Sequence, residues 1–285
     1  MVVSVLTGVL GRRAGRHGPA LALGILPIAF LLVLFVYPVL RLLLFSVENG
    51  SLAHFEKALT DGLYVQVLLA TFEIAIVVAV ICLLLGYPVA YLLATASPFW
   101  AGFGFALLLL PFWTSVLVRT YAWMIILGRN GIFNRTLLEL GIVDQPLALL
   151  HNTTGVLIGM VHVLLPYMVF PIYSIMKRVD MQLLSAAEGL GASSAQAFRR
   201  IYLPLTLPGV FAGMTLVFII SLGFFITPAL LGGGRVMMIG VQVERLVRQY
   251  LDWSLAAAVA VILLAVALGV AAFFRRVLKG DLTWT

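Results

Sequence analysis

The chain has 285 residues, of which 63% are hydrophobic and only 10% are charged, and its formal net charge is +7. Because a soluble domain carries about 25% charged residues, this composition excludes a globular protein with a water-facing surface. Several apolar runs exceed the roughly 18 residues that cross a bilayer, and backbone groups in lipid must be hydrogen-bonded within the protein, which favours helices. The sequence therefore predicts an all-α, polytopic membrane protein.

Six apolar stretches are expected to cross the membrane. Residues 1–19 carry Arg12, Arg13 and Arg16 and are predicted to be a cytoplasmic segment ahead of one transmembrane domain, residues 20–285. The first apolar run is too long for the core of a signal peptide, so we expect an uncleaved first span. In chain order the predicted spans are about 20–47, 65–94, 101–127, 154–176, 205–231 and 255–274.

The connections between these spans differ in character. Residues 128–153 and 232–254 are expected to form longer outer loops, and the second contains an amphipathic helical pattern that suits a membrane surface, a docked partner or the chain's own spans. Prolines inside or beside the spans, among them Pro88, Pro111 and Pro166, favour kinks.

The distribution of lysine and arginine predicts the orientation. With six spans, both termini lie on one side, and that side would hold ten basic and three acidic side chains, which accounts for the whole net charge of +7. The positive-inside rule places this side in the cytoplasm. Both termini and the connection between the fourth and fifth spans are therefore expected to be cytoplasmic.

Several kinds of chemistry are excluded. None of the lysines, Lys57, Lys177 and Lys279, follows a glycine and precedes Ser or Thr, so the chain lacks the phosphate-binding loop of an ATPase. Cys82 is the only cysteine and rules out an intrachain disulfide. No His, Cys and carboxylate cluster predicts a metal, and no Ser–His–Asp arrangement predicts catalysis. We expect no enzyme activity, no cofactor or metal in this chain, and no nucleic-acid partner.

Few ionisable residues fall within the predicted spans, which argues against an ion-coupled carrier. Glu73 and Arg119 either pair with each other or line a polar path, and the sequence favours neither alternative. His162 is expected to be a hydrogen-bonded packing residue, and Arg41 to reach the membrane interface. A cationic substrate would meet Glu73 and the aromatic rings of Tyr121, Trp123 and Phe224.

The stretch from Asp180 to Val210 interrupts two apolar spans with a different pattern. Val179, Leu183, Ala187 and Leu190 recur at helical spacing, which predicts a short amphipathic helix. Gly191 is expected to end this helix, and a second helical run carries Phe198 and the Arg199–Arg200 pair before Pro204 and Pro208.

This stretch resembles the "EAA" loop of the membrane permease subunits of bacterial ABC importers. Ser185-Ala186-Ala187, Gly191 and Ile201-x-Leu203-Pro204 have the spacing of the family pattern E-A-A-x(3)-G-x(9)-I-x-L-P. Ser185 stands where the pattern has Glu, which puts a charge contact there in doubt, and Glu188 lies one helical turn away and could partly replace that charge.

Other segments resemble the spermidine/putrescine-type permease group, specifically its first permease subunit. They are PFWTSVLVRTYAW (111–123), LGRNGIFNRTLLELGI (127–142), LLGYPVAYLLA (84–94) and LGFFITPALLGGG (222–234). The resemblance implies a type I importer fold with six transmembrane helices in a bacterial inner membrane. It also implies a second permease subunit, a cytoplasmic ABC ATPase dimer that binds ATP and Mg, and a periplasmic solute-binding protein.

The resemblance further implies that a coupling segment, about residues 177–205, docks on the ATPase. Val179, Leu183, Leu184 and Leu190 would be apolar anchors, Gly191 the turn, and Arg199 and Arg200 contacts for acidic groups or anionic lipid. The residues assigned to coupling are Leu183, Leu184, Ser185, Ala186, Ala187, Glu188, Gly191, Ala192, Arg199, Ile201, Leu203 and Pro204.

The implied substrate is a small amine, foremost a polyamine, and the same group also serves opines, aminophosphonates and other small amino compounds. Two other functions remain as alternatives to an importer permease, namely a secondary carrier and a non-transporting scaffold. The sparse intramembrane charges oppose the first, and the coupling segment would have no purpose in the second.

Overall fold

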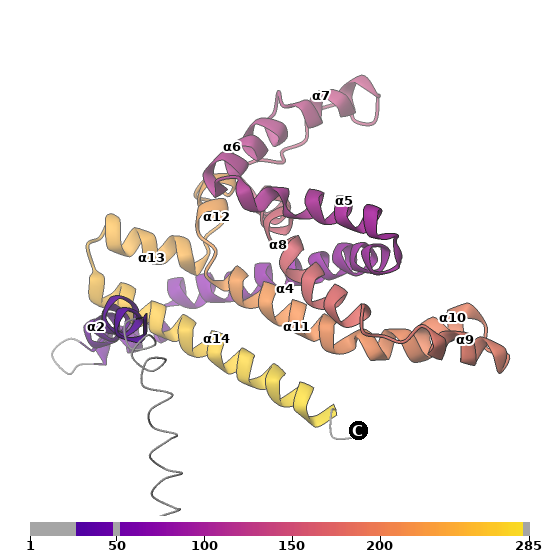
Figure 1. Cartoon of the computed structure of the whole chain (residues 1–285). Coiled ribbons are helices and arrows are strands. Elements are labelled where there is room, and N and C mark those ends of the chain that lie inside the picture. The colour runs from indigo at the N-terminus through magenta and orange to yellow at the C-terminus, as the bar shows by residue number, and fades with distance from the viewer. Residues whose placement is uncertain (1–26, 48–51, 282–285) are drawn as a thin grey trace, which may run out of the picture.

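The structure of the chain is a computed structural model that describes residues 27–47 and 52–281 (Figure 1). The predicted segment 1–19 lies outside these residues. All regular secondary structure in the described residues is helical. Five stretches are long and apolar enough to cross a membrane, namely Pro27–Phe45, Gly62–Thr95 (α4), Thr153–Met176 (α8), Ser194–Leu222 and Trp253–Phe274. The predicted all-α membrane fold is confirmed.

The third predicted span, 101–127, is not one straight helix. It consists of α5 (Pro98–Leu109), a 3₁₀ turn (Leu110–Trp113) and α6 (Val116–Leu127), which continues into α7 (Ile132–Glu139). The two halves, Pro98–Trp113 and Val116–Glu139, are bent by 101°. Pro111 has no N–H to donate to the preceding turn, and Thr114 is extended, so the α-helical ladder cannot continue through this point. In Figure 1 the α6–α7 arm leads away from the rest of the bundle.

The fifth predicted span, 205–231, has different bounds in the structure. Its helical stretch already begins at Ser194, through α10 (Ser194–Ala197), the π-helical turn η4 (Phe198–Tyr202) and α11 (Leu203–Leu222). The chain leaves the helix at Gly223, and a separate short helix, α12 (Ile226–Leu231), packs against α6 and α8. The apolar run is therefore divided between a span and a folded-back helix, a division that hydropathy alone does not detect.

The remaining helices pack on one another and against α4 and α11. They are the π-helical turn η1 (Leu32–Val36), α2 (Tyr37–Phe45), α3 (Ala53–Thr60), α13 (Ile239–Arg248) and α14 (Trp253–Asp281). The predicted amphipathic helix of the 232–254 loop is α13, which packs against α14 through its apolar side, with Ile239 and Leu246 buried. The residues of Pro27–Phe45 are almost wholly exposed, as expected for a helix that meets lipid or a second subunit.

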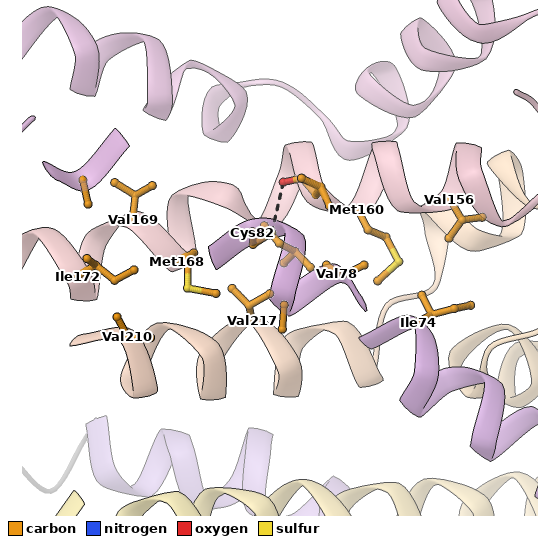
Figure 2. Close-up of a cluster of buried hydrophobic side chains, with 14 of the residues drawn as sticks. Ile74, Val78, Cys82, Val156, Met160, Met168, Val169, Ile172, Val210 and Val217 are labelled. Atoms are coloured by element: carbon orange, nitrogen blue, oxygen red, sulfur yellow. Dashed lines mark hydrogen bonds between the residues drawn. The ribbon is translucent and has the colours of Figure 1, made fainter. Parts of the chain in front are cut away.

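The core lies where α4, α8 and α11 pack together at the centre of the molecule (Figure 1). Val78 and Cys82 of α4, Met160 and Met168 of α8 and Val217 of α11 are fully buried and face one another (Figure 2). The Cys82 thiol donates a long hydrogen bond to the carbonyl oxygen of Val161, with a separation of 3.9 Å. α4 and α8 continue as helices through Pro88, Pro166 and Pro171.

Glycines allow α11 to approach α8 closely. A Cβ atom at Gly213 would lie 2.8 Å from the sulfur and 3.0 Å from the carbonyl oxygen of Met168, and one at Gly209 would lie 2.9 Å from the carbonyl oxygen of Pro171. Helices in membranes associate through such small residues because lipid supplies little hydrophobic driving force. The α8–α11 pair therefore forms a closely packed support for the segment that joins these two helices.

Candidate coupling segment and polar path

The coupling segment extends beyond the bundle at the end opposite α13 (Figure 1). It contains α9 (Gln182–Gly189), a turn at Gly191 with φ of +91°, and α10. Ser193 and Gln196 form a capping box at the start of α10: the Ser193 hydroxyl accepts from the Gln196 N–H (3.3 Å), and the Gln196 side chain accepts from the Ser193 N–H (3.1 Å). The predicted helix, glycine turn and second helix are all present.

The apolar anchors proposed from the sequence fall into two groups. Leu183 is 48% exposed and Leu190 is 90% exposed, so both side chains are available to a partner. Val179 and Leu184 instead pack against the buried core of the bundle. Leu184 therefore holds α9 against this chain, while Leu183 and, just after the helix end, Leu190 leave an apolar surface partly open.

The other residues assigned to coupling also divide into exposed and partly buried positions. Ser185, Ala186, Glu188, Gly191, Arg199 and Pro204 are exposed, whereas Ala187, Ala192, Ile201 and Leu203 are half-buried. Glu188 makes no ion pair with another described residue, and the hydroxyl of Ser185 donates to the carbonyl oxygen of Met181 at 3.5 Å. The carboxylate near the position where the family pattern has Glu is therefore free to meet an external charge.

Four aromatic side chains join the coupling segment to α4. Phe198 stacks on Tyr202 with a centroid separation of 5.6 Å, and its ring meets Tyr91 edge-on at 5.9 Å and Tyr87 at 6.4 Å. Tyr202 is fully buried, and the Tyr87 hydroxyl is hydrogen-bonded to that of Thr206 at 2.9 Å. We call Tyr87, Tyr91, Phe198 and Tyr202 the aromatic cluster.

The backbone at the aromatic cluster is unusual, because Phe198–Tyr202 is a π-helical turn, a feature that is frequent at functional sites. A further contact lies beside it, where the Lys177 ammonium group donates to the carbonyl oxygen of Ala94 at the end of α4 (3.1 Å). Sequence reasoning noticed Phe198 but missed Tyr87, Tyr91 and Tyr202, whose shared location depends on how α4 packs. The coupling segment therefore contacts α4 through these side chains, in addition to its continuous chain connection with α11.

Glu73 does not pair with Arg119. Glu73 is exposed on α4 and lines a cavity of about 280 Å³ together with Arg235 and Thr153, whereas Arg119 lies on α6. No ion pair joins Glu73 to any described residue. Of the two alternatives left by the sequence, direct pairing is absent from the structure.

The remaining residues of the predicted polar path are dispersed. Trp123 of α6 donates from its indole nitrogen to Nδ1 of His162 on α8 (3.1 Å), so His162 is hydrogen-bonded as expected. Arg119 lies one turn before Trp123, and its buried Nε has no partner among the described residues. Tyr121 is exposed, at a helical spacing that directs it to another side of α6. Phe224 is half-buried in the break between α11 and α12.

No metal centre is present in the described part of the chain. No group of three His, Cys, Asp or Glu side chains there has a geometry that could hold a metal ion. The features that stand out are the exposed apolar side chains at α9, the aromatic cluster behind them, and an acidic side chain in a cavity near the other end of the bundle.

Solved structures share this fold. A bacterial alginate ABC transporter, solved in complex with an alginate-pentasaccharide-bound periplasmic protein, matches with a TM-score of 0.72 and 18% identity, over 94% of this chain and 98% of that one. The MetNI methionine ABC transporter matches with a TM-score of 0.57 and 18% identity, over 76% of this chain and 94% of that one.

Sequence comparison gives a more specific relationship. The spermidine/putrescine transport system permease protein PotB of Escherichia coli (strain K12) is 40% identical over 205 residues, which cover 72% of this chain and 74% of that protein. PotB of Haemophilus influenzae is 38% identical and covers 71% of each chain. The family described as "Binding-protein-dependent transport system inner membrane component" matches residues 21–280. The chain belongs to this family and is a permease subunit of a binding-protein-dependent ABC importer.

Proposed function

We propose that the chain is the first permease subunit of a polyamine importer, driven by a separate ATPase dimer that docks on the coupling segment. The observation that carries the coupling role is the exposed apolar face of α9 beyond the bundle, with Leu190 90% exposed. Burying a leucine side chain contributes about 1.5–3 kcal/mol, so a groove that covers Leu183 and Leu190 would gain much of its affinity there. The similarity to spermidine/putrescine permeases supports the assignment of a polyamine as the substrate.

The proposed cycle uses the contacts behind α9. Closure of the ATPase pair on ATP and Mg would move α9, and the aromatic cluster would transmit this movement to α4 while η4 transmits it to α11. The spans would then change from inward-open to outward-open and accept substrate from a periplasmic solute-binding protein. A second permease subunit completes the path, and this chain itself hydrolyses no ATP.

The proposed orientation places the coupling segment and both termini in the cytoplasm of a bacterial cell. Lys177, Arg178, Arg199 and Arg200 are all exposed at the same end of the bundle as α9, in agreement with the positive-inside rule. The same cations would attract acidic groups of a partner or anionic lipid.

Co-purification tests the coupling role. Replacing Leu183 and Leu190 together by aspartate should remove most of the ATPase that co-purifies with the chain, because the variant places charge where an apolar contact is expected. Leu140→Asp is the matched control, since Leu140 is 67% exposed next to α7, away from the coupling segment. Undiminished ATPase in the double variant, or an equal loss in the control, contradicts the proposal.

The aromatic cluster gives a separate prediction. Phe198→Ala removes three ring contacts, each worth about 0.5–1.5 kcal/mol, without touching the exposed face of α9. We expect uptake per ATP hydrolysed to fall about tenfold while the ATPase still co-purifies, and Phe198→Tyr to restore most of it. Phe273→Ala, at an exposed ring on α14, controls for general loss of aromatic surface. Normal coupling in Phe198→Ala would show that the cluster only packs.

The substrate class is tested on the solute-binding protein that works with this permease. Calorimetry with spermidine and putrescine should give saturable binding, and an opine and an aminophosphonate should bind more weakly. A small amino compound with an acidic group is the second candidate, favoured by Arg235 in the cavity and by the unpaired Nε of Arg119. Tighter binding of such a compound than of either polyamine would replace the proposed substrate.

A further inference from the structure

The cavity at Glu73 is bounded by elements that are distant in sequence. Its walls come from α4 (Ala70, Glu73, Ile74, Val77), the start of α8 (Thr153, Leu157) and the loop before α13 (Arg235, Val236, Met237), and its volume is about 280 Å³. Most of the lining residues are apolar, and the polar ones are Glu73, Thr153 and Arg235. Small-molecule sites commonly combine apolar walls with a few polar groups in this way.

The loop that carries Arg235 is held firmly against α4 and α8. The backbone N–H of Ile239 donates to the Thr71 hydroxyl on α4 at 2.8 Å, half a turn from Glu73, and this bond is buried. The N–H of Arg235 itself donates to the carbonyl oxygen of Gly232 at 3.0 Å. Val236 and Met238 are buried in the core on either side of Met237. The cavity is therefore a preformed feature of the fold.

The carboxylate in this cavity requires a physical explanation. Glu73 lies 11 residues after Gly62, about 17 Å along a span at 1.5 Å per residue. Acidic side chains within spans are costly and generally face a partner charge or a water-filled path. Glu73 has no ion-pair partner among the described residues, although Arg235 lines the same cavity. Its carboxylate is left available for a cation from outside the chain.

We propose that this cavity binds one ammonium group of the transported amine at Glu73, and that Arg235 weakens the binding enough for release. This proposal rests on the proposed polyamine substrate. The methylene chain of the amine lies along Ile74, Val77 and Leu157, and the Thr153 hydroxyl is available to accept from the ammonium group. Transport requires a site that admits its substrate without retaining it, and a nearby guanidinium lowers the affinity of a carboxylate for a cation.

The test uses the complete importer, purified with its ATPase and second permease subunit. Retention of labelled putrescine is measured without ATP and without the binding protein, and uptake is measured in proteoliposomes with both. Glu73→Gln should lower retention and uptake about tenfold or more, because a charge-assisted hydrogen bond is lost. Arg235→Gln should raise retention several-fold and slow uptake. In the Glu73→Gln background, Arg235→Gln should have almost no effect on either quantity, since both groups act on the same ammonium.

A matched control removes the same charges elsewhere. Glu244 and Arg248 form an ion pair at 3.5 Å on α13, at the same end of the bundle, and Glu244→Gln and Arg248→Gln should leave retention unchanged. The site is refuted if the wild type does not retain putrescine or if Glu73→Gln retains it normally. It is also refuted if Arg235→Gln has the same effect with and without Glu73→Gln. A further contradicting outcome is that Glu244→Gln or Arg248→Gln changes retention as much as the variants in the cavity do. If the wild type retains putrescine through Glu73 but shows no ATP-driven putrescine uptake, the proposed function is refuted while the proposed binding site is supported.

Discussion

Replacing Gly191 by valine is expected to abolish substrate uptake while the chain stays folded in the membrane. Gly191 has φ of +91°, a conformation that a β-branched residue adopts only with strain of about 1–3 kcal/mol. The turn is a Schellman motif: the Gly191 N–H donates to the Glu188 carbonyl oxygen at 2.9 Å, and the Ala192 N–H donates to that of Ala187 at 3.0 Å. A changed turn redirects α9 relative to α10, so Leu183 and Leu190 would no longer face the proposed ATPase partner.

Open space around Gly191 makes this variant a selective probe. A Cβ atom there meets nothing within 4 Å, so valine strains the turn without disturbing the core. Gly189→Val is the matched control, because Gly189 has equal space and an ordinary φ two residues earlier. Uptake and ATP hydrolysis in proteoliposomes, with a thermal melt of each variant, measure the outcome. Normal uptake by Gly191→Val, or the same loss in Gly189→Val, would contradict this role for the turn.

Sequence reasoning succeeded where a pattern reflects local physics. Hydropathy located the spans that became α4 and α8 to within a few residues, since length and apolar content alone decide whether a helix can cross a bilayer. The helical spacing of the apolar residues from Val179 to Leu190, followed by Gly191, indicated helix, turn and helix, because a glycine that ends a helix is recognisable from its neighbours.

Sequence reasoning failed where tertiary contacts decide the structure. The apolar residues 205–231 read as one span, yet α12 separates at Gly223 and packs against α6 and α8. Pro111 signalled a kink, but the size of the bend, 101°, depends on what surrounds it. Tyr87 and Phe198 are more than a hundred residues apart, and Glu73 and Arg235 line one cavity only because the loop before α13 folds back against α4. Such pairings are invisible in the pattern of a single sequence.

Substituting both Gly209 and Gly213 by valine is expected to prevent assembly of the bundle. The neighbours that a new side chain would meet are largely backbone atoms, namely the carbonyl oxygens of Pro171 and Met168 and the Cα of Ile172 at 3.0 Å, which cannot rotate away. Overpacking a well-packed core costs about 1–3 kcal/mol at a single site, and here two adjacent turns of α11 would be forced from α8 together. We expect a large fall in membrane yield and in melting temperature.

Gly269→Val separates this effect from a general intolerance of larger residues in spans. Gly269 lies on α14 with nothing within 4 Å of its Cβ position, so valine there should leave yield and melting temperature unchanged. Gly213→Ala should give a yield and a melting temperature between those of Gly269→Val and the double variant, since its single methyl group still meets the Met168 carbonyl oxygen. A double variant that melts like wild type would mean that α8 and α11 can separate without loss. The coupling segment would then have no rigid support, and the transmission of force from α9 to the spans would have to follow the aromatic cluster and α4 alone.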